Sequence, residues 1–272
     1  MNAIKFGCQT YPWKMSANRF RGQMPHIIKQ IANAGYQGLE AEIDMLGEYF
    51  YKPAQLKELL FENNITLCSL VLHQPWEHEQ ETEEEHRFSL LAIDFLKHFP
   101  FAKLVVSHHA GDVERGTGKE LLQRRRNLIS CMNSVCNIAA EEGIVTCYHP
   151  NSSKNSLFRT AEDYEVLFDM LEGTDIGYAP DIGHIVNGGM DPLTILKKSR
   201  QKIRHVHFKD RTAQCKWAVM GEGNIDFDQI VSYLKATDYR GWIVVEDESP
   251  RAQQNPDDAV KRDAEYILKY KG

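Results

Sequence analysis

Eight short apolar runs alternate along the chain with eight longer segments in which apolar residues recur every three or four positions. Short apolar runs bounded by glycine, proline or charge are typical of buried strands, and the longer period is typical of helices that bury one face. The predicted strands are residues 4–11, 38–43, 65–72, 102–107, 144–149, 175–180, 203–209 and 242–246. The predicted helices are residues 24–34, 53–63, 79–99, 119–142, 160–171, 192–199, 227–237 and 256–270. This alternation within 272 residues predicts an α/β fold, a single (β/α)8 TIM barrel in one domain over residues 1–272.

Residues that start and stop helices support these boundaries. Gly35, Gly143 and Gly241 stand where a helix must turn into the next strand, a position that favours glycine. Thr160 and Asp191 stand where their side chains can cap the first turn of a helix. Because periodicity does not determine strand order, an open doubly wound sheet remains the alternative to a closed barrel.

Composition and charge exclude several classes of partner. The chain has 32 Lys and Arg against 38 Asp and Glu, a net charge of -6, so we expect no nucleic acid partner. No run approaches the roughly 20 apolar residues that span a bilayer, so we expect no membrane partner. The six cysteines form no CxxC motif, and the N-terminal residues show no export signal. Free thiols in a cytoplasmic protein are therefore the expectation.

Four predicted strands in the second half of the chain end on side chains that commonly bind metals. These residues are His149, Asp181, His207 and Glu246. Active sites of barrel enzymes form at the C-terminal ends of the strands, so we expect the four to hold one divalent metal ion. Two imidazoles and two carboxylates favour Mn²⁺ or Co²⁺, with Zn²⁺, Fe²⁺ or Mg²⁺ as the other candidates.

Polar residues also end most of the other predicted strands. We expect Gln9, Tyr11, Glu40 and His108 to bind substrate. Any one of these side chains could instead hold a loop by hydrogen bonds. It is their repetition at equivalent positions that favours a functional site.

Several motifs identify a family resemblance that covers nearly the whole chain. They are GCQTY at 7–11, LE at 39–40, PDIGH at 180–184, HVHFKD at 205–210, GEGNIDF at 221–227 and YRGWIVVE at 239–246. With these motifs the chain resembles the xylose isomerase-like superfamily of TIM-barrel sugar isomerases, epimerases and dehydratases. The resemblance implies a metal held by Glu, Asp, His and Glu at the ends of strands five to eight. By position, the last three ligands fall on Asp181, His207 and Glu246.

The first ligand position departs from this pattern, because His149 stands where the superfamily usually has Glu. Isomerases and epimerases of this kind generally use two facing glutamates as acid and base, and here only Glu246 remains. Histidine at this position, with the GEGNIDF and GWIVVEDES segments, makes the chain look more like the inosose (2-keto-myo-inositol) dehydratases. The resemblance then implies a metal-dependent lyase acting on a polyhydroxy ketone, such as an inosose or a 3-keto sugar. Glu246 would be its base. His184 or Lys209 would be the acid that assists the leaving hydroxyl, with His108 or His109 as further candidates for that role.

Other functions remain open at this point. The runner-up is a metal-dependent sugar isomerase or ketose 3-epimerase. An apurinic endonuclease-like DNA repair enzyme is a distant alternative, since such enzymes share the fold but need further metal ligands and act on an anionic substrate. A barrel without catalytic activity is also possible. The resemblance further implies a homo-oligomer.

Overall fold

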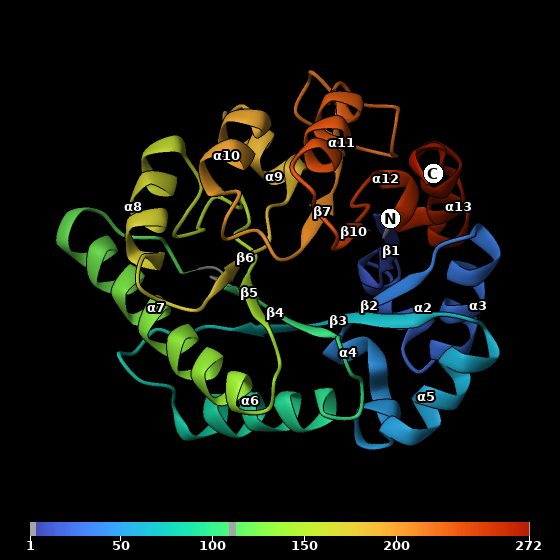
Figure 1. The fold of residues 1–272 in the computed structure, drawn as a ribbon, viewed down its shortest axis with the longest axis horizontal. Helices are drawn as coiled ribbons and strands as arrows, with labels where there is room; N and C mark the ends of the chain where they lie inside the picture. The colour runs from blue at the N-terminus through green and yellow to red at the C-terminus, as the bar shows by residue number, and fades with distance from the viewer. Residues whose placement is uncertain (1–3, 109–112, 272) are drawn as a thin grey trace. The chain divides into compact units, whose positions relative to one another are not determined.

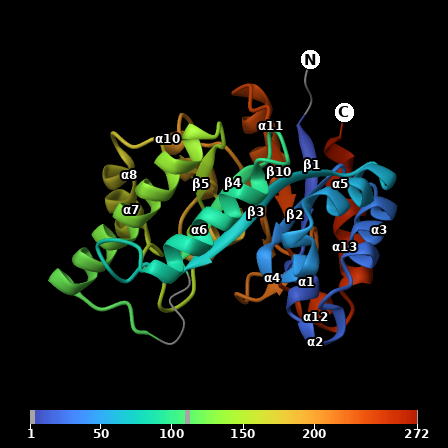
Figure 2. The same cartoon turned by 90° about the horizontal axis from the view of Figure 1, so that it is seen from below.

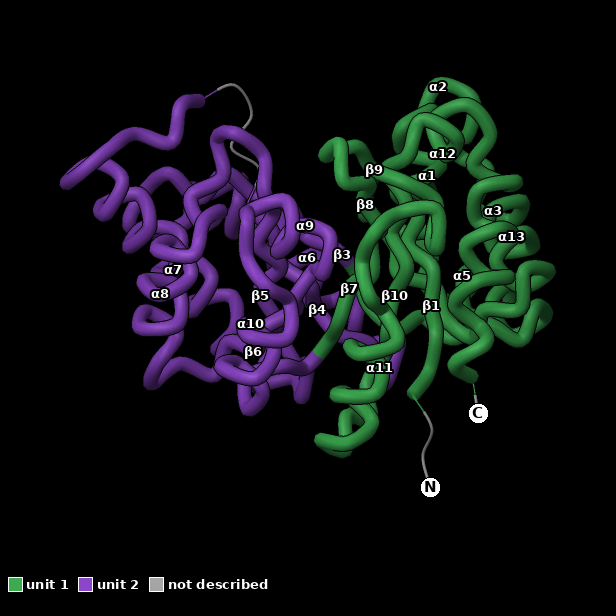
Figure 3. The backbone as a smooth tube through the Cα atoms, turned by 90° about the horizontal axis from the view of Figure 1, so that it is seen from above, with its two compact units in different colours: residues 1–70, 205–272 green, residues 71–204 purple. Residues whose placement is uncertain are grey.

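The computed structural model describes residues 4–108 and 113–271, with the elements labelled in Figure 1 and Figure 2. These residues form two compact units, shown in Figure 3. Unit 1 comprises Met1–Leu70 and His205–Gly272, and unit 2 comprises Val71–Arg204. Strand β3 (Thr66–Gln74) passes from one unit into the other, with five residues in unit 1 and four in unit 2.

The sheet of unit 1 has the strand order β3-β2-β1-β10-β7. Its other strands are β1 (Lys5–Gln9), β2 (Gly38–Glu42), β7 (Val206–Phe208) and β10 (Trp242–Val245). Strand β1 runs parallel to both β2 and β10, and β10 runs parallel to β7. Parallel pairing places the C-terminal ends of these strands at one edge of the sheet, where the candidate site residues stand.

Helices cover the sheet of unit 1 because each buries one apolar face. The longer ones are α3 (Met24–Ala34), α5 (Pro53–Glu62), α11 (Phe227–Ala236) and α13 (Pro256–Ile267). Helix α3 packs beside α13, as Figure 2 shows. The shorter elements are α1 (Tyr11–Lys14), α2 (Ala17–Phe20), α4 (Ile43–Leu46), η1 (Gly47–Tyr51), α12 (Pro250–Gln254), η2 (Leu268–Tyr270) and the hairpin β8 (Asp210–Arg211) with β9 (Trp217–Ala218).

The sheet of unit 2 has the order β6-β5-β4-β3. Strand β5 (Thr146–Tyr148) runs parallel to β4 (Lys103–His108) on one side and to β6 (Gly177–Tyr178) on the other. The helices of this unit are α6 (Glu83–Leu96), α7 (Gly118–Glu141), α8 (Ala161–Leu171), α9 (Ile182–Asn187) and α10 (Pro192–Ser199). Small apolar residues from its strands pack together in the core, namely Val71, Val105, Cys147 and Ala179.

The sixteen predicted elements are all present, but several strands are shorter than their apolar runs. Strand β6 covers only Gly177–Tyr178 of the run over 175–180, and β7 covers only Val206–Phe208 of the run over 203–209. Outside these strands, Ile203 pairs with Tyr178 in an isolated parallel bridge. Thr160 and Asp191 cap α8 and α10 as expected, and Gly35 ends α3 in a left-handed conformation.

No helix in the described part of the chain combines the length and the apolar character needed to cross a bilayer.

Candidate functional site

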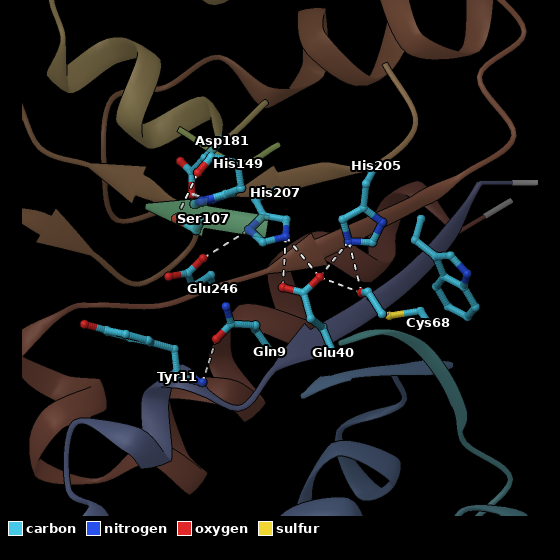
Figure 4. Close-up of polar contacts among 12 residues, drawn as sticks. Gln9, Tyr11, Glu40, Cys68, Ser107, His149, Asp181, His205, His207 and Glu246 are labelled. Carbon is cyan, nitrogen blue, oxygen red and sulfur yellow. Dashed lines mark hydrogen bonds and ion pairs between the residues drawn. The ribbon is translucent and has the colours of Figure 1, made fainter. Parts of the chain in front are cut away.

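An imidazole–carboxylate pair lies at the strand ends of unit 1. His207 is the middle residue of β7, and the ladder pairs it with Val244 of the neighbouring β10. Glu246 follows β10 directly, and its amide donates to the Phe208 carbonyl oxygen over 3.0 Å. As a result, His207 Nδ1 lies 3.1 Å from Glu246 Oε2 (Figure 4). Both side chains are buried.

The second oxygen of the Glu246 carboxylate is held by a buried lysine. Lys209 Nζ donates to Glu246 Oε1 over 3.0 Å and also to the Glu248 carboxylate. The lysine side chain is 0% exposed, and its ammonium lies 5.3 Å from the centroid of the Trp217 ring. Lys209 therefore orients Glu246, and its predicted role as general acid stays a prediction.

Glu40 on β2 contacts the opposite nitrogen of the same imidazole. Its Oε1 lies 2.9 Å from His207 Nε2, and its Oε2 lies 2.8 Å from His205 Nε2. Ser69 Oγ donates to the same Oε2 over 2.5 Å. The Glu40 side chain is 0% exposed, and its Oε2 also lies 3.1 Å from His207 Nε2, whereas its Oε1 has no hydrogen-bond partner among the described residues. The predicted substrate role of Glu40 stays a prediction.

The charges of this network shift two pKa values in opposite directions. Burial alone would lower the pKa of His207, but the Glu40 and Glu246 carboxylates outweigh it and raise the pKa to about 10. Burial alone would raise the pKa of Glu40, but His207 and His205 hold it well below its usual range. A protonated His207 therefore offsets one of the two carboxylate charges beside it.

Gln9 and Tyr11 form the turn from β1 into α1. The Gln9 Oε1 accepts a hydrogen bond from the Tyr11 amide over 2.8 Å, and its Nε2 lies 3.5 Å from Glu42 Oε1. Gln9 is thus buried and shapes the backbone. The Tyr11 side chain is partly exposed, and burial, with the charges of Glu248 and Glu246, raises the pKa of its phenol to about 12. Tyr11 therefore remains a hydrogen-bond donor at neutral pH, which suits the predicted substrate contact.

A second imidazole–carboxylate pair lies at the strand ends of unit 2. His149 follows β5, where its amide donates to the Val106 carbonyl over 2.9 Å and its own carbonyl accepts from Ser107 Oγ over 3.0 Å. Asp181 caps helix α9, because its Oδ1 accepts from the His184 amide over 2.8 Å. The other oxygen, Oδ2, lies 3.5 Å from His149 Nε2.

The predicted acid His184 lies beside this second pair. Its ring centroid is 5.7 Å from that of His149. The Ser152 amide donates to His184 Nδ1 over 3.3 Å, and Ser152 Oγ lies 2.8 Å from the same nitrogen while accepting from Asn187 Nδ2 over 2.7 Å. Because Nδ1 accepts hydrogen bonds, the neutral His184 ring carries its proton on Nε2. In this form the ring can donate a hydrogen bond through Nε2, and its predicted role as the acid stays a prediction.

His108, the predicted substrate contact at the end of β4, is also buried in unit 2. Its Nε2 lies 3.9 Å from Glu77 Oε1, and its carbonyl accepts from Asn151 Nδ2 over 3.0 Å. Arg124 holds Glu77 through two donors, at 3.0 Å from Nε and 2.6 Å from Nη2. The neighbouring candidate His109 lies outside the described residues.

The HVHFKD and GEGNIDF motifs are joined by hydrogen bonds in unit 1. The Asp210 carboxylate accepts from four backbone amides, those of Arg211, Gly221, Gly223 and Ile225. A Cβ on Gly223 would lie 2.1 Å from Asp210 Oδ1, so only glycine allows this approach. Asp210 thus anchors the loop that leads into α11, so Asp210 and the GEGNIDF residues serve the fold of the site rather than its chemistry.

Two further site residues, His205 and Ser69, escaped the sequence analysis. His205 was present in the HVHFKD motif, and a residue two positions before a strand-end histidine projects from the same face of the strand. That alternation was the available signal for His205. No signal in the sequence pointed to Ser69, because a serine inside an apolar strand most often only makes a hydrogen bond within the core.

Each unit therefore presents one imidazole and one carboxylate in a similar arrangement. In unit 1, Lys209 fixes one oxygen of Glu246 and the other faces His207. In unit 2, the His184 amide fixes one oxygen of Asp181 and the other faces His149. Nitrogen and oxygen ligands of this kind suit a divalent transition metal.

The family profile of the xylose isomerase-like TIM barrel matches residues 28–270. The chain belongs to the xylose isomerase-like TIM barrel family. This membership confirms the predicted (β/α)8 fold and excludes the open doubly wound sheet. It also agrees with the resemblance inferred from the motifs.

Proteins that are similar to this chain carry the names of several activities. The inosose dehydratase of Bacillus thuringiensis (strain Al Hakam) is 26% identical over 305 aligned residues, covering 100% of this chain and 98% of the relative. The 3-keto-D-glucoside 4-epimerase YcjR of E. coli has a TM-score of 0.75 at 18% identity, covering 98% of this chain and 99% of the neighbour. The IolI protein, solved with a bound zinc atom, has a TM-score of 0.76 at 16% identity, covering 98% of each chain.

Proposed function

We propose that the protein is a divalent-metal-dependent dehydratase that removes water from a polyhydroxy ketone, such as an inosose or a 3-keto sugar. The observation that carries the proposal is the pair of imidazole–carboxylate arrangements, each with one carboxylate oxygen anchored and the other turned toward the ring. The full-length similarity to inosose dehydratases supports the choice of reaction.

The proposed metal ligands are His149, Asp181, His207 and Glu246. Two nitrogen and two oxygen donors leave coordination positions for a carbonyl and a neighbouring hydroxyl of the substrate, and they favour Mn²⁺ or Co²⁺ over Ca²⁺. The anchored carboxylates fit this use, because a ligand that is already oriented loses little conformational entropy on binding. A bound ion would polarise the ketone and so acidify the adjacent C–H bond.

The chain's own residues account for the protons of the elimination. Glu246 accepts the proton from the carbon next to the ketone, and the electrons of that C–H bond form the new C=C bond. The C–O bond at the next carbon breaks, and the leaving hydroxide takes a proton from His184 and departs as water. His184 enters this step as the imidazolium and leaves it as the neutral ring. Lys209 holds the Glu246 carboxylate in place through this step, and Tyr11 donates a hydrogen bond to a substrate hydroxyl.

The competing reaction is isomerisation or 3-epimerisation of a free ketose. It requires a second base facing Glu246, and the usual position of that base is occupied by His149. A proton returned to the opposite face of the carbon would need a carboxylate that this sequence position lacks. The single carboxylate therefore favours elimination.

The test is an anaerobic assay of the metal-loaded protein with Mn²⁺ or Co²⁺. A panel of keto-inositols, 3-keto-glycosides and free ketoses is followed for enone absorbance and for interconversion of the ketoses. We expect enone formation from the first two groups, loss of it in Asp181→Asn, and normal turnover in His98→Ala, which removes an exposed histidine. Ketose interconversion without any enone would assign the protein to the isomerases or epimerases.

A further inference from the structure

The His207 imidazole is held by carboxylates at both of its nitrogens. Glu246 lies 3.1 Å from Nδ1, and Glu40 lies 2.9 Å from Nε2 (Figure 4). The first contact involves two proposed metal ligands. The second involves a residue that comes from β2 and that the proposed reaction does not use.

Glu40 is itself fixed more firmly than a substrate-binding acid would be. Its Oε2 contacts His205 Nε2 at 2.8 Å and Ser69 Oγ at 2.5 Å, while its Oε1 contacts His207. The side chains of Glu40 and His205 are 0% exposed, and that of His207 is 1% exposed. Three internal contacts converge on one oxygen of this carboxylate, because Oε2 also lies 3.1 Å from His207 Nε2, and the side chain has no exposed surface to offer a sugar hydroxyl.

We propose that Glu40 is a positioning residue for the metal ligand His207. This inference rests on the proposed function, since it assumes that His207 binds an ion. A hydrogen bond from Nε2–H to the Glu40 carboxylate selects the tautomer whose Nδ1 carries the lone pair. It also fixes the ring plane, so that this lone pair points to the side on which Glu246 lies. Carboxylates behind metal-bound histidines act in this way and make the imidazole a stronger ligand.

His205 and Ser69 hold the Glu40 carboxylate in place. Both contact Oε2, the oxygen to which His207 Nε2 also makes its hydrogen bond, and so they hold the carboxylate against the His207 ring. The three contacts together link β2, β3 and the segment around β7 within unit 1.

Another reading of the same residues is a second metal site, because ligand atoms of Glu40, His205 and His207 lie within 4.8 Å of one another. Two features favour positioning. His207 would have to ligate through both nitrogens and so lose both ring protons. In addition, the three side chains are almost entirely buried, and the distances between them are those of ordinary hydrogen bonds.

The test measures metal affinity rather than turnover, by competition of Mn²⁺ or Zn²⁺ against a chelator, together with the number of ions per chain. Glu40→Gln keeps the shape but replaces a carboxylate oxygen with an amide, and we expect its affinity to fall about 10- to 100-fold. Ser69→Ala leaves Glu40 in place but removes one of its donors, and we expect a smaller loss of roughly 2- to 10-fold. Glu42→Gln is the matched control, since Glu42 is a buried carboxylate on the same strand that contacts Gln9 and Lys14. It should bind the ion as the unaltered protein does.

The outcomes separate this inference from the proposed reaction. One ion per chain with weakened binding in Glu40→Gln and Ser69→Ala supports the positioning role, even if no substrate in the panel undergoes elimination. Unchanged affinity in both variants overturns it while leaving the dehydratase proposal intact. Two ions per chain, falling to one in Glu40→Gln, would identify Glu40 as a ligand and also overturn it. A wild-type protein that binds no divalent ion would overturn both proposals.

Discussion

Lys209 contributes to the proposed site through a contact that its strand-end position alone does not reveal. Its ammonium is enclosed by the Glu246 and Glu248 carboxylates and by the face of Trp217. An ammonium in this setting keeps the two carboxylates from repelling each other and directs one oxygen of Glu246.

We therefore expect Lys209→Gln to lower kcat by about 10²- to 10⁴-fold, the usual range for losing a group that assists proton transfer. KM should change much less, since the contact lies behind Glu246. Steady-state kinetics on the metal-loaded enzyme measures both constants. The control is Lys235→Gln, a change at the end of α11 that leaves the Glu246 contacts intact. Normal kcat in Lys209→Gln would remove the lysine from the mechanism.

The identity of several site residues could be predicted from the sequence, because an apolar run that stops on a histidine or carboxylate is visible without a structure. His149, Asp181, His207 and Glu246 were found in this way. The partner of each side chain could not be predicted. Glu40 was expected at a strand end like Tyr11, yet it lies in the middle of β2 and is internal, whereas Tyr11 follows β1 and is partly exposed. Which way a polar side chain turns depends on donors from other strands, and a single-sequence pattern contains no such pairing.

At the scale of the elements, the first turn of helix α8 contains a carboxylate that accepts hydrogen bonds from several donors. Asp163 accepts from the Thr160 and Arg159 amides and contacts Arg115 and Arg125. Burial alone would raise the pKa of Asp163, but the Arg115 hydrogen bond and the other donors outweigh it. They lower the pKa from 3.8 to about 2.

This shift predicts how stability depends on pH. Because the folded pKa is lower than the unfolded one, the ionised Asp163 contributes about 2 kcal/mol, present in full above about pH 4. The contribution is lost as the pH falls toward 2. We expect Asp163→Asn to be less stable than the unaltered protein at pH 7, with the difference shrinking between pH 4 and 2. Denaturant unfolding across this range provides the measurement.

The matched control for this prediction is Asp191→Asn, which changes the exposed cap of α10. Asparagine is also a good capping residue, so its cost should stay well under about 1 kcal/mol. If both variants lost the same stability at every pH, the arginine contacts of Asp163 would not be the cause.

The loop before α11 offers a second test at this scale. In Gly223→Ala the new methyl group would meet Asp210 Oδ1 at 2.1 Å and the Arg211 carbonyl oxygen at 2.6 Å. Since the latter is backbone, the loop must shift, and we expect a cost of about 1–3 kcal/mol. Denaturant unfolding measures the cost, and a fall in kcat would follow from the movement of Lys209, which precedes Asp210. A fully stable and active variant would show that the loop can move without consequence.

At the scale of the whole molecule, metal binding should be visible as thermal stability. An ion that binds only the folded chain stabilises it by about 2.7 kcal/mol at 100 times its Kd, which raises Tm by roughly 5–10 °C. We expect this rise when Mn²⁺ or Co²⁺ is added to chelator-treated protein. It should vanish in His207→Ala and persist in His98→Ala. An equal rise in both variants would place the ion elsewhere.

The fold of the molecule was far easier to predict than its site, because eight repeats of one pattern reinforce one another. Even so, the β8–β9 hairpin and helix α9 were missed. The hairpin pairs only Asp210–Arg211 with Trp217–Ala218, and two-residue strands leave too short an alternation to detect. Helix α9 begins at Asp181 as its cap, which the sequence analysis had interpreted only as a strand end. The expected homo-oligomer stays a prediction.

The same hairpin offers a position for a fluorescent probe. Of the six cysteines, five are buried and only Cys215, at the hairpin tip, is exposed. A thiol-reactive fluorophore should therefore label one known position without any substitution. Two residues further along, Trp217 covers the ammonium of Lys209. Quenching between the dye and this indole would let substrate or metal binding be followed in real time in the natural protein.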